Sequence, residues 1–168
     1  MSSPNLRIVA LLLALALPLA LSACSSLRPV YGDNGLTNQA VALAYAKPAN
    51  RLEQVIYQSL ALRLGKSDSA GAPLVAVVAR QSTRTLTKGT AISPNEQRQM
   101  TVTADVTLTA PDGKVLFAGT RAASADYTTD PQALSNQAAE TEAAERAAKA
   151  LAETLRLTLI AALASSPQ

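Results

Sequence analysis

The segment Met100–Ala110 constrains the fold more than any other part of the chain, because apolar and polar residues alternate through it without a break. This alternation is the pattern of a β-strand with one buried and one exposed face. The tripeptide Pro-Asp-Gly at 111–113 then predicts a tight hairpin turn, followed by a partner strand from Lys114 to about Tyr127. The exposed face of the first strand would be rich in threonine.

The register of this hairpin can also be predicted. If residues 110 and 114 pair, Leu108 faces Leu116, and the apolar faces of the two strands coincide, which supports the pairing. Arg121 then lies opposite Thr103, where we expect it to act as a structural cross-strand partner.

Helix signals lie on both sides of the hairpin. Asn50 and Glu53 have the spacing of a capping box, apolar residues recur at helical spacing as far as Leu64, and Gly65 suits the position after a helix end. Segments 41–47 and 74–87 have the residue types and bounding prolines or glycines of β-strands.

The C-terminal part of the chain predicts one long helix. Asp130 and Pro131 are a typical helix start, and residues 132–166 contain neither glycine nor proline. A helix from 131 to about 164 would be roughly 50 Å long, so we expect it to kink, fray or protrude from a domain of this size. Its expected apolar stripe contains Leu134, Ala138, Ala148, Leu151, Leu155 and Leu159.

Together these elements predict an α+β fold, a four-stranded sheet with two helices packed on one face as a sandwich, preceded by a signal peptide. The leader, residues 1–23, has one positive charge and a short apolar run, and it ends in Leu-Ser-Ala before Cys24. This is the pattern of a bacterial lipoprotein processing site, so Cys24 is the expected lipidation site. Residues 24–37 would be a lipidated tether and residues 38–165 the folded domain.

Composition excludes several classes of function. The chain has no histidine, and Cys24 is its single cysteine, so histidine-based triads and Cys/His zinc sites are ruled out. No catalytic residue, metal site or cofactor is predicted, and we expect a protein that is not an enzyme. Removal of the leader leaves a net charge of about +2, which does not indicate nucleic-acid binding.

The residues after Cys24 carry a family resemblance. Arg28-Pro29-Val30-Tyr31-Gly32 resembles the start of alphaproteobacterial lipopolysaccharide-assembly lipoproteins of the LptE type, although their Gly-Phe after the cysteine is replaced by Ser25-Ser26-Leu27. Tyr127, followed by a polar loop and a long Ala/Glu helix, is also similar to that family.

The resemblance implies an outer-membrane lipoprotein, lipid-anchored and facing the periplasm. Such a protein assembles with the LptD β-barrel, plugs its lumen and aids the transport and insertion of lipopolysaccharide. LptD, lipopolysaccharide and the membrane are therefore the expected partners.

Three cations are the candidate lipopolysaccharide-binding residues. Arg80, Arg84 and Lys88 recur at a spacing of four, which on a regular strand places them on one face over about 27 Å. Guanidinium groups bind phosphate through paired hydrogen bonds. On a regular strand the same face would also carry the apolar residues Leu74, Val78 and Leu86. Either a bulge therefore shifts the register, or the basic stripe is interrupted. The alternative interpretation is a solvated edge strand whose basic residues prevent aggregation.

Two other functions stay open at this point. The periplasmic lipoprotein component of an ABC-type lipid-trafficking system is also small, lipidated and α+β. A purely structural lipoprotein without a ligand is the other alternative. Loss of full-length barrel from the cell surface after depletion would favour the LptE-type function.

Overall fold

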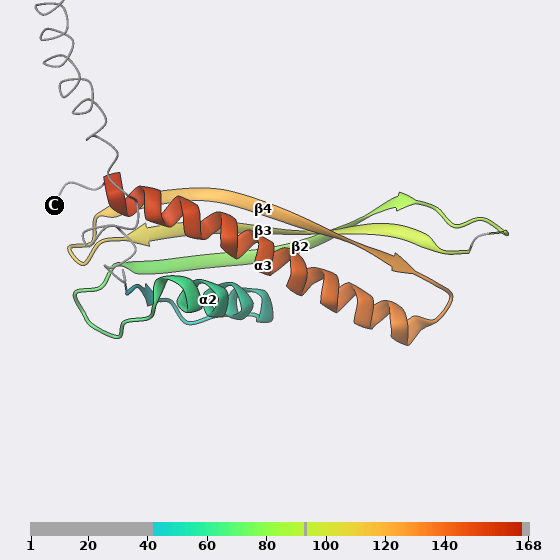
Figure 1. The fold of residues 1–168 in the computed structure, drawn as a ribbon, viewed down its shortest axis with the longest axis horizontal. Coiled ribbons are helices and arrows are strands. Elements are labelled where there is room, and N and C mark those ends of the chain that lie inside the picture. The colour runs from blue at the N-terminus through green and yellow to red at the C-terminus, as the bar shows by residue number, and fades with distance from the viewer. Residues whose placement is uncertain (1–41, 93, 166–168) are drawn as a thin grey trace, which may run out of the picture. The chain divides into compact units, whose positions relative to one another are not determined.

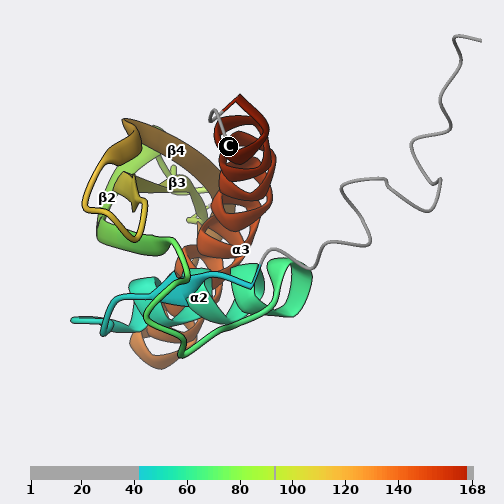
Figure 2. The same ribbon diagram turned by 90° about the vertical axis from the view of Figure 1, so that its left-hand side faces the viewer.

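The computed structural model describes residues 42–92 and 94–165, which form one sheet with two helices against it (Figure 1). A view along the strands places both helices on the same side of the sheet (Figure 2). The predicted α+β sandwich is therefore confirmed. Its elements are β1 (Ala44–Tyr45), α2 (Arg51–Leu64), β2 (Leu74–Thr87), β3 (Glu96–Thr109), β4 (Val115–Thr129) and α3 (Ala133–Ser165).

The sheet follows chain order, β1-β2-β3-β4. Short β1 runs parallel to β2, whereas β2, β3 and β4 form an antiparallel meander. β1 pairs only with Leu74 and Val75, so most of β2 has no neighbouring strand on that side. β3 begins at Glu96, four residues before the alternation indicates. The pattern misses this start because the first residues of β3 are polar on both faces.

The hairpin turn is as predicted, but the predicted register is wrong beyond the pair of Thr109 with Val115. The Ala110 amide donates to the Lys114 carbonyl at 2.8 Å, which closes the turn. A bulge then shifts the pairing by one residue, so that Leu108 pairs with Phe117 instead of Leu116. A bulge places two residues of one strand opposite one of the other, and alternation alone does not reveal it.

This bulge also corrects the expected role of Arg121. Its neighbour across the sheet is the buried Ala104, not Thr103. Its guanidinium lies 5.6 Å from the centre of the Phe117 ring, within cation–π range, and donates to the Thr120 carbonyl at 2.9 Å. Arg121 therefore contacts its own strand and is not a cross-strand partner.

Helix α2 has the predicted caps. The Asn50 side chain accepts from the Glu53 amide at 3.0 Å, as an N-cap residue does. Gly65 ends the helix with φ +81°, a conformation that residues with a Cβ rarely adopt, and its amide donates to Ala61.

Helix α3 has the predicted length but not the whole predicted stripe. It begins at Ala133, after a turn in which Asp130 accepts from the Gln132 amide. Leu134, 85% exposed, and Ala138 are outside the core, contrary to the prediction, because the first turns of α3 protrude past α2 (Figure 1). The helix thus protrudes at its N-terminal end, one of the three expected outcomes.

The core lies between the helices and the inner face of the sheet. Ala147, Ala148 and Leu151 pack with the inner residues of β2 and β3. Farther along, Met100 and Tyr127 pack against Ala143 and Ala144 in a second cluster. The small alanines of α3 allow that helix to lie close to the sheet. The fully buried large side chains are Leu43, Ile56, Leu60, Val75, Met100, Val102, Val106, Leu108, Leu151, Leu155 and Leu159.

Several predictions concern residues outside the described part of the chain. These are the signal peptide 1–23, the tether 24–37 with Cys24, and the motif residues Arg28, Pro29, Tyr31 and Gly32. Within 42–92 and 94–165, neither α2 nor α3 combines the length and the apolar character that a membrane crossing requires.

Candidate functional site

The candidate site is the face of the sheet that no helix covers. We call it the outer face. On β3 it carries Gln97, Gln99, Asp105 and four threonines at alternating positions, as the alternation predicts. The inner face, by contrast, is buried beneath α2 and α3. A broad hydrogen-bonding surface is therefore available to a partner.

Three strands are linked across this face by Asp105. Arg80 of β2 donates to one Asp105 carboxylate oxygen at 2.6 Å, and the Thr120 hydroxyl of β4 donates to the other. The Thr120 hydrogen bond and, next to it, Arg80 hold the pKa of Asp105 below its usual range. Arg80 is therefore already partnered within the sheet, although its side chain is 62% exposed.

A second link lies nearer the loop between β2 and β3. Arg84 donates through Nε to the Gln99 side-chain oxygen at 2.9 Å, and the Gln99 amide donates to Asp126 at 2.9 Å. Between the two links, the hydroxyls of Thr101 and Ser124 are 2.8 Å apart. The outer face is thus a ladder of polar groups that satisfy one another, and their remaining donors and acceptors point to solvent.

The predicted basic stripe is only partly continuous. Arg80 and Arg84 share the outer face with Val78, which is 63% exposed. The register shifts between Thr85 and Thr87, and Lys88 follows the last residue of β2. Residues four apart lie on the same face only where the strand is regular, and a bulge breaks this rule. Lys88 therefore does not continue the row formed by the two arginines.

The exposed edge of β2 is partly occupied by side chains of α2. The Tyr57 hydroxyl accepts from the Val77 amide at 2.8 Å. The buried Glu53 carboxylate accepts from the Ala79 amide at 3.2 Å, and Asn50 donates to the Ala79 carbonyl at 3.1 Å. These polar side chains replace a neighbouring strand: they bond to the backbone of Val77 and Ala79, the two outward-directed positions that follow the short β1. Beyond Ala79 they make no such bond.

A cleft of about 430 Å³ opens where this protection ends. It lies between the start of α2, β2 near Ala79 and the N-terminal half of α3, and its wall includes Leu52 and Ala144. An ion pair of 3.0 Å between Arg51 and Glu145 joins the two helices there. The cleft offers apolar surface with charged groups nearby.

Sequence reasoning did not find the acceptors that link the three strands. Asp105, Gln99 and Asp126 lie at polar positions of strands that were recognised, yet their partners depend on the register beyond the bulge. It also treated Glu53 only as a helix cap. The signal for its second role was a carboxylate on an otherwise apolar face of α2, which must find donors when it is buried.

Hydroxyl, amide and ion-pair groups of this kind recognise a partner by noncovalent contacts. They offer hydrogen bonds to sugar, phosphate or polypeptide, and the arginines are the donors with the highest charge. The fold and this face together define a helix-backed sheet with one polar, uncovered side.

Three solved lipoprotein structures share the fold. A protein described as a lipoprotein from Caulobacter crescentus CB15 aligns with a TM-score of 0.58 and 20% identity, over 77% of this chain and 96% of that one. Rare lipoprotein B from Shewanella oneidensis gives 0.57 and 12%, over 73% and 95%. A minor lipoprotein from Acinetobacter baumannii gives 0.52 and 15%, over 71% and 89%.

The family model for LptE, described as lipopolysaccharide-assembly, matches residues 38–159. The match covers most of the chain, including every strand, α2 and most of α3, so the protein belongs to the LptE family and its role lies in lipopolysaccharide assembly. The resemblance seen in the sequence is confirmed. No curated protein matches the chain closely in sequence.

Proposed function

We propose that this protein is a lipoprotein of the outer membrane, anchored through lipid on Cys24 and facing the periplasm. In this proposal it assembles with LptD, plugs the lumen of that β-barrel and aids the transport and insertion of lipopolysaccharide. Family membership supports the general role. The cysteine after the leader supports the anchor, because two or more acyl chains give stable attachment without a transmembrane helix.

The polar outer face is the observation that carries the plug proposal. The lumen of a large outer-membrane barrel is polar, and a plug must offer it hydrogen-bonding groups rather than apolar surface. The ladder from Arg80 through Asp105 to Thr120 meets this need, because its groups are already paired and lose little when water is excluded.

Depletion of the protein tests this function. The amount of folded, full-length LptD at the cell surface should fall, and lipopolysaccharide in the outer leaflet should fall with it. Unchanged LptD together with altered phospholipid distribution would contradict the proposal and favour the lipid-trafficking alternative.

Direct lipopolysaccharide binding by Arg80, Arg84 and Lys88 is the second part of the proposal. Both arginines keep N–H donors beyond those used within the sheet, and all three residues are exposed. Lys88 lies past the bulge, so Lys88 would contact a different part of the ligand from the arginine pair.

Replacing all three with alanine should weaken binding of purified lipopolysaccharide by about tenfold or more, since each charge-assisted contact contributes about 1.5–3 kcal/mol. The matched control replaces Arg63, Lys66 and Lys149, three exposed cations away from the outer face, and should bind as the wild type does. Equal binding by both folded variants would refute direct recognition by these residues.

A further inference from the structure

The free half of β2, residues 81–87, has a row of backbone groups without a partner strand. Val77 and Ala79 direct their amides away from β3, toward Tyr57 and Glu53. Because these directions alternate along a strand, Gln81, Thr83 and Thr85 direct theirs to the same side. In the part of the chain that the structure describes, no group bonds to the amides or carbonyls of these three residues on that side. All three residues are exposed.

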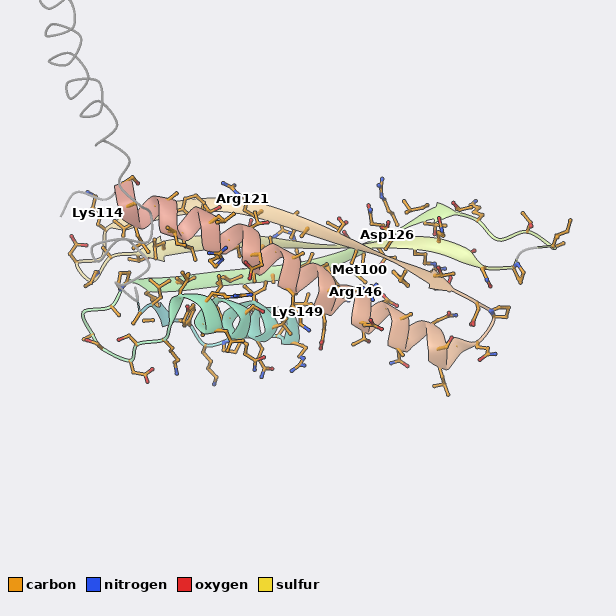
Figure 3. All side chains as sticks on the ribbon, in the orientation of Figure 1. Met100, Lys114, Arg121, Asp126, Arg146 and Lys149 are labelled. Carbon is orange, nitrogen blue, oxygen red and sulfur yellow. The ribbon has the colours of Figure 1, made fainter. Side chains whose placement is uncertain are left out.

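The other outer edge of the sheet differs. On β4, the Thr120 carbonyl accepts from Arg121 and the Asp126 carbonyl accepts from Arg146 of α3 at 2.8 Å. Figure 3 labels Asp126 on β4 and Arg146 on α3. This edge is therefore partly occupied along its length, whereas β2 is open beyond Ala79 (Figure 1).

We propose that residues 81–85 of β2 bind an extended segment of LptD as an added β-strand, an inference that rests on the proposed function. Strand addition to an exposed edge gives affinity through main-chain hydrogen bonds and specificity through alternate side chains. Five residues offer about 17 Å of edge, enough for a short strand. The segment would occupy the side of β2 that α2 leaves free.

The surroundings of the edge specify the chemistry of that segment. On the helix side, the 430 Å³ cleft begins at Ala79 and Gln81 and is partly apolar, so it suits an apolar side chain at one end of the added strand. On the outer side, Arg84 bonds to the neutral Gln99 and keeps further N–H donors, which favours an acidic side chain opposite it. The bound strand should alternate between apolar and acidic or polar residues.

The same charges disfavour a second copy of this chain as the occupant. Antiparallel pairing of two β2 strands centred on Thr83 would place Arg84 of each copy opposite Ser82 of the other. Each Arg84 would then lie diagonal to both Arg80 and Arg84 of the other copy, on one face. Like charges at such positions are destabilising.

Proline at position 83 tests the proposal in the full-length, lipidated protein. Thr83→Pro removes an amide that points away from β3, so the ladder inside the sheet keeps its hydrogen bonds. It also removes the weak contact between the Thr83 hydroxyl and Met100 sulfur at 3.7 Å, and Thr83→Val controls for that loss while keeping the amide. Ala122→Pro makes the matching change at an exposed, outward-pointing position of β4.

We expect Thr83→Pro to reduce the LptD recovered with the tagged protein from membranes by about tenfold, while Thr83→Val and Ala122→Pro recover wild-type amounts. Wild-type recovery by Thr83→Pro would overturn the inference and leave the proposed function intact. Failure of the wild-type protein to recover LptD would instead overturn the proposed function.

If Thr83→Pro does not fold, photo-crosslinking answers the same question. A photoreactive residue at Thr85 should crosslink to LptD, and one at Leu62, an 85% exposed position of α2 away from the outer face, should crosslink at least fivefold less. Crosslinking at Thr85 to a second copy of the chain, or equal capture of LptD from both positions, would overturn the proposal.

Discussion

Replacing the buried Glu53 should destabilise the domain more than replacing Glu145, which belongs to a more exposed ion pair. Its carboxylate is buried, with 3% of the residue exposed. One oxygen accepts from the Ala49 amide at 2.6 Å, and the other from Asn50 Nδ2 at 3.0 Å and the Ala79 amide at 3.2 Å. The residue therefore joins the start of α2 to the edge of β2.

Glu53→Gln keeps one oxygen acceptor but places an N–H₂ group toward the Ala49 amide. The variant then loses one charge-assisted hydrogen bond and sets two donors against each other, which costs about 2–3 kcal/mol. In a domain of this size, that corresponds to a melting temperature roughly 5–10 °C lower. Equilibrium urea unfolding, followed by far-UV circular dichroism, measures the loss.

Glu145→Gln is the matched control for this prediction. Glu145 forms the ion pair with Arg51 beside the same cleft, but the arginine side chain is 62% exposed. Such a pair contributes at most about 1 kcal/mol. If Glu53→Gln and Glu145→Gln lose the same free energy of unfolding, the link between α2 and the β2 edge does not stabilise the fold.

Two further predictions concern the core and alkaline pH. Leu155→Ala removes a fully buried side chain and should lower the free energy of unfolding by about 2–5 kcal/mol. Leu157→Ala, at a 61% exposed position, should change it by less than about 0.5 kcal/mol. Similar losses for the two variants in urea unfolding would contradict the assigned core. Burial raises the pKa of Tyr45 to about 12. The unfolded chain releases this proton near pH 10, so stability present below pH 10 is lost as pH rises toward 12. Tyr45→Phe should make the fall in urea midpoint between pH 9 and 11.5 smaller, and an unchanged fall would rule out this titration.

The sequence predicted the elements well, since each has a local signal. The alternation through Met100–Ala110, the Asn50 cap and the Gly65 stop act over a few residues. The register of β4 was not predictable beyond the turn, because the bulge that shifts it has no periodic signature. Leu134 has the right spacing for the α3 stripe, yet whether a helix turn is covered depends on where its neighbours end.

The candidate site was harder to predict than the fold. The spacing correctly placed Arg80 and Arg84 on one face. Their hydrogen-bond acceptors, Asp105 and Gln99, belong to another strand, so they could not be predicted from spacing along β2. The spacing of four places Lys88 with them only on a strand that is regular through Leu86, and the bulge expected as one of two possibilities lies between Thr85 and Thr87. The free edge of β2 follows from the length of β1. The pattern predicted a strand over 41–47, but only Ala44–Tyr45 form one, and the pattern does not show how much of a segment pairs.

Co-purification with LptD tests the central claim most directly. The tagged, full-length protein is extracted from outer membranes in mild detergent, and the bound proteins are identified and quantified by mass spectrometry. We expect LptD in about a one-to-one ratio with this protein, in a complex that survives size-exclusion chromatography. Recovery of the protein without LptD, or with the subunits of an inner-membrane transporter in its place, would contradict it.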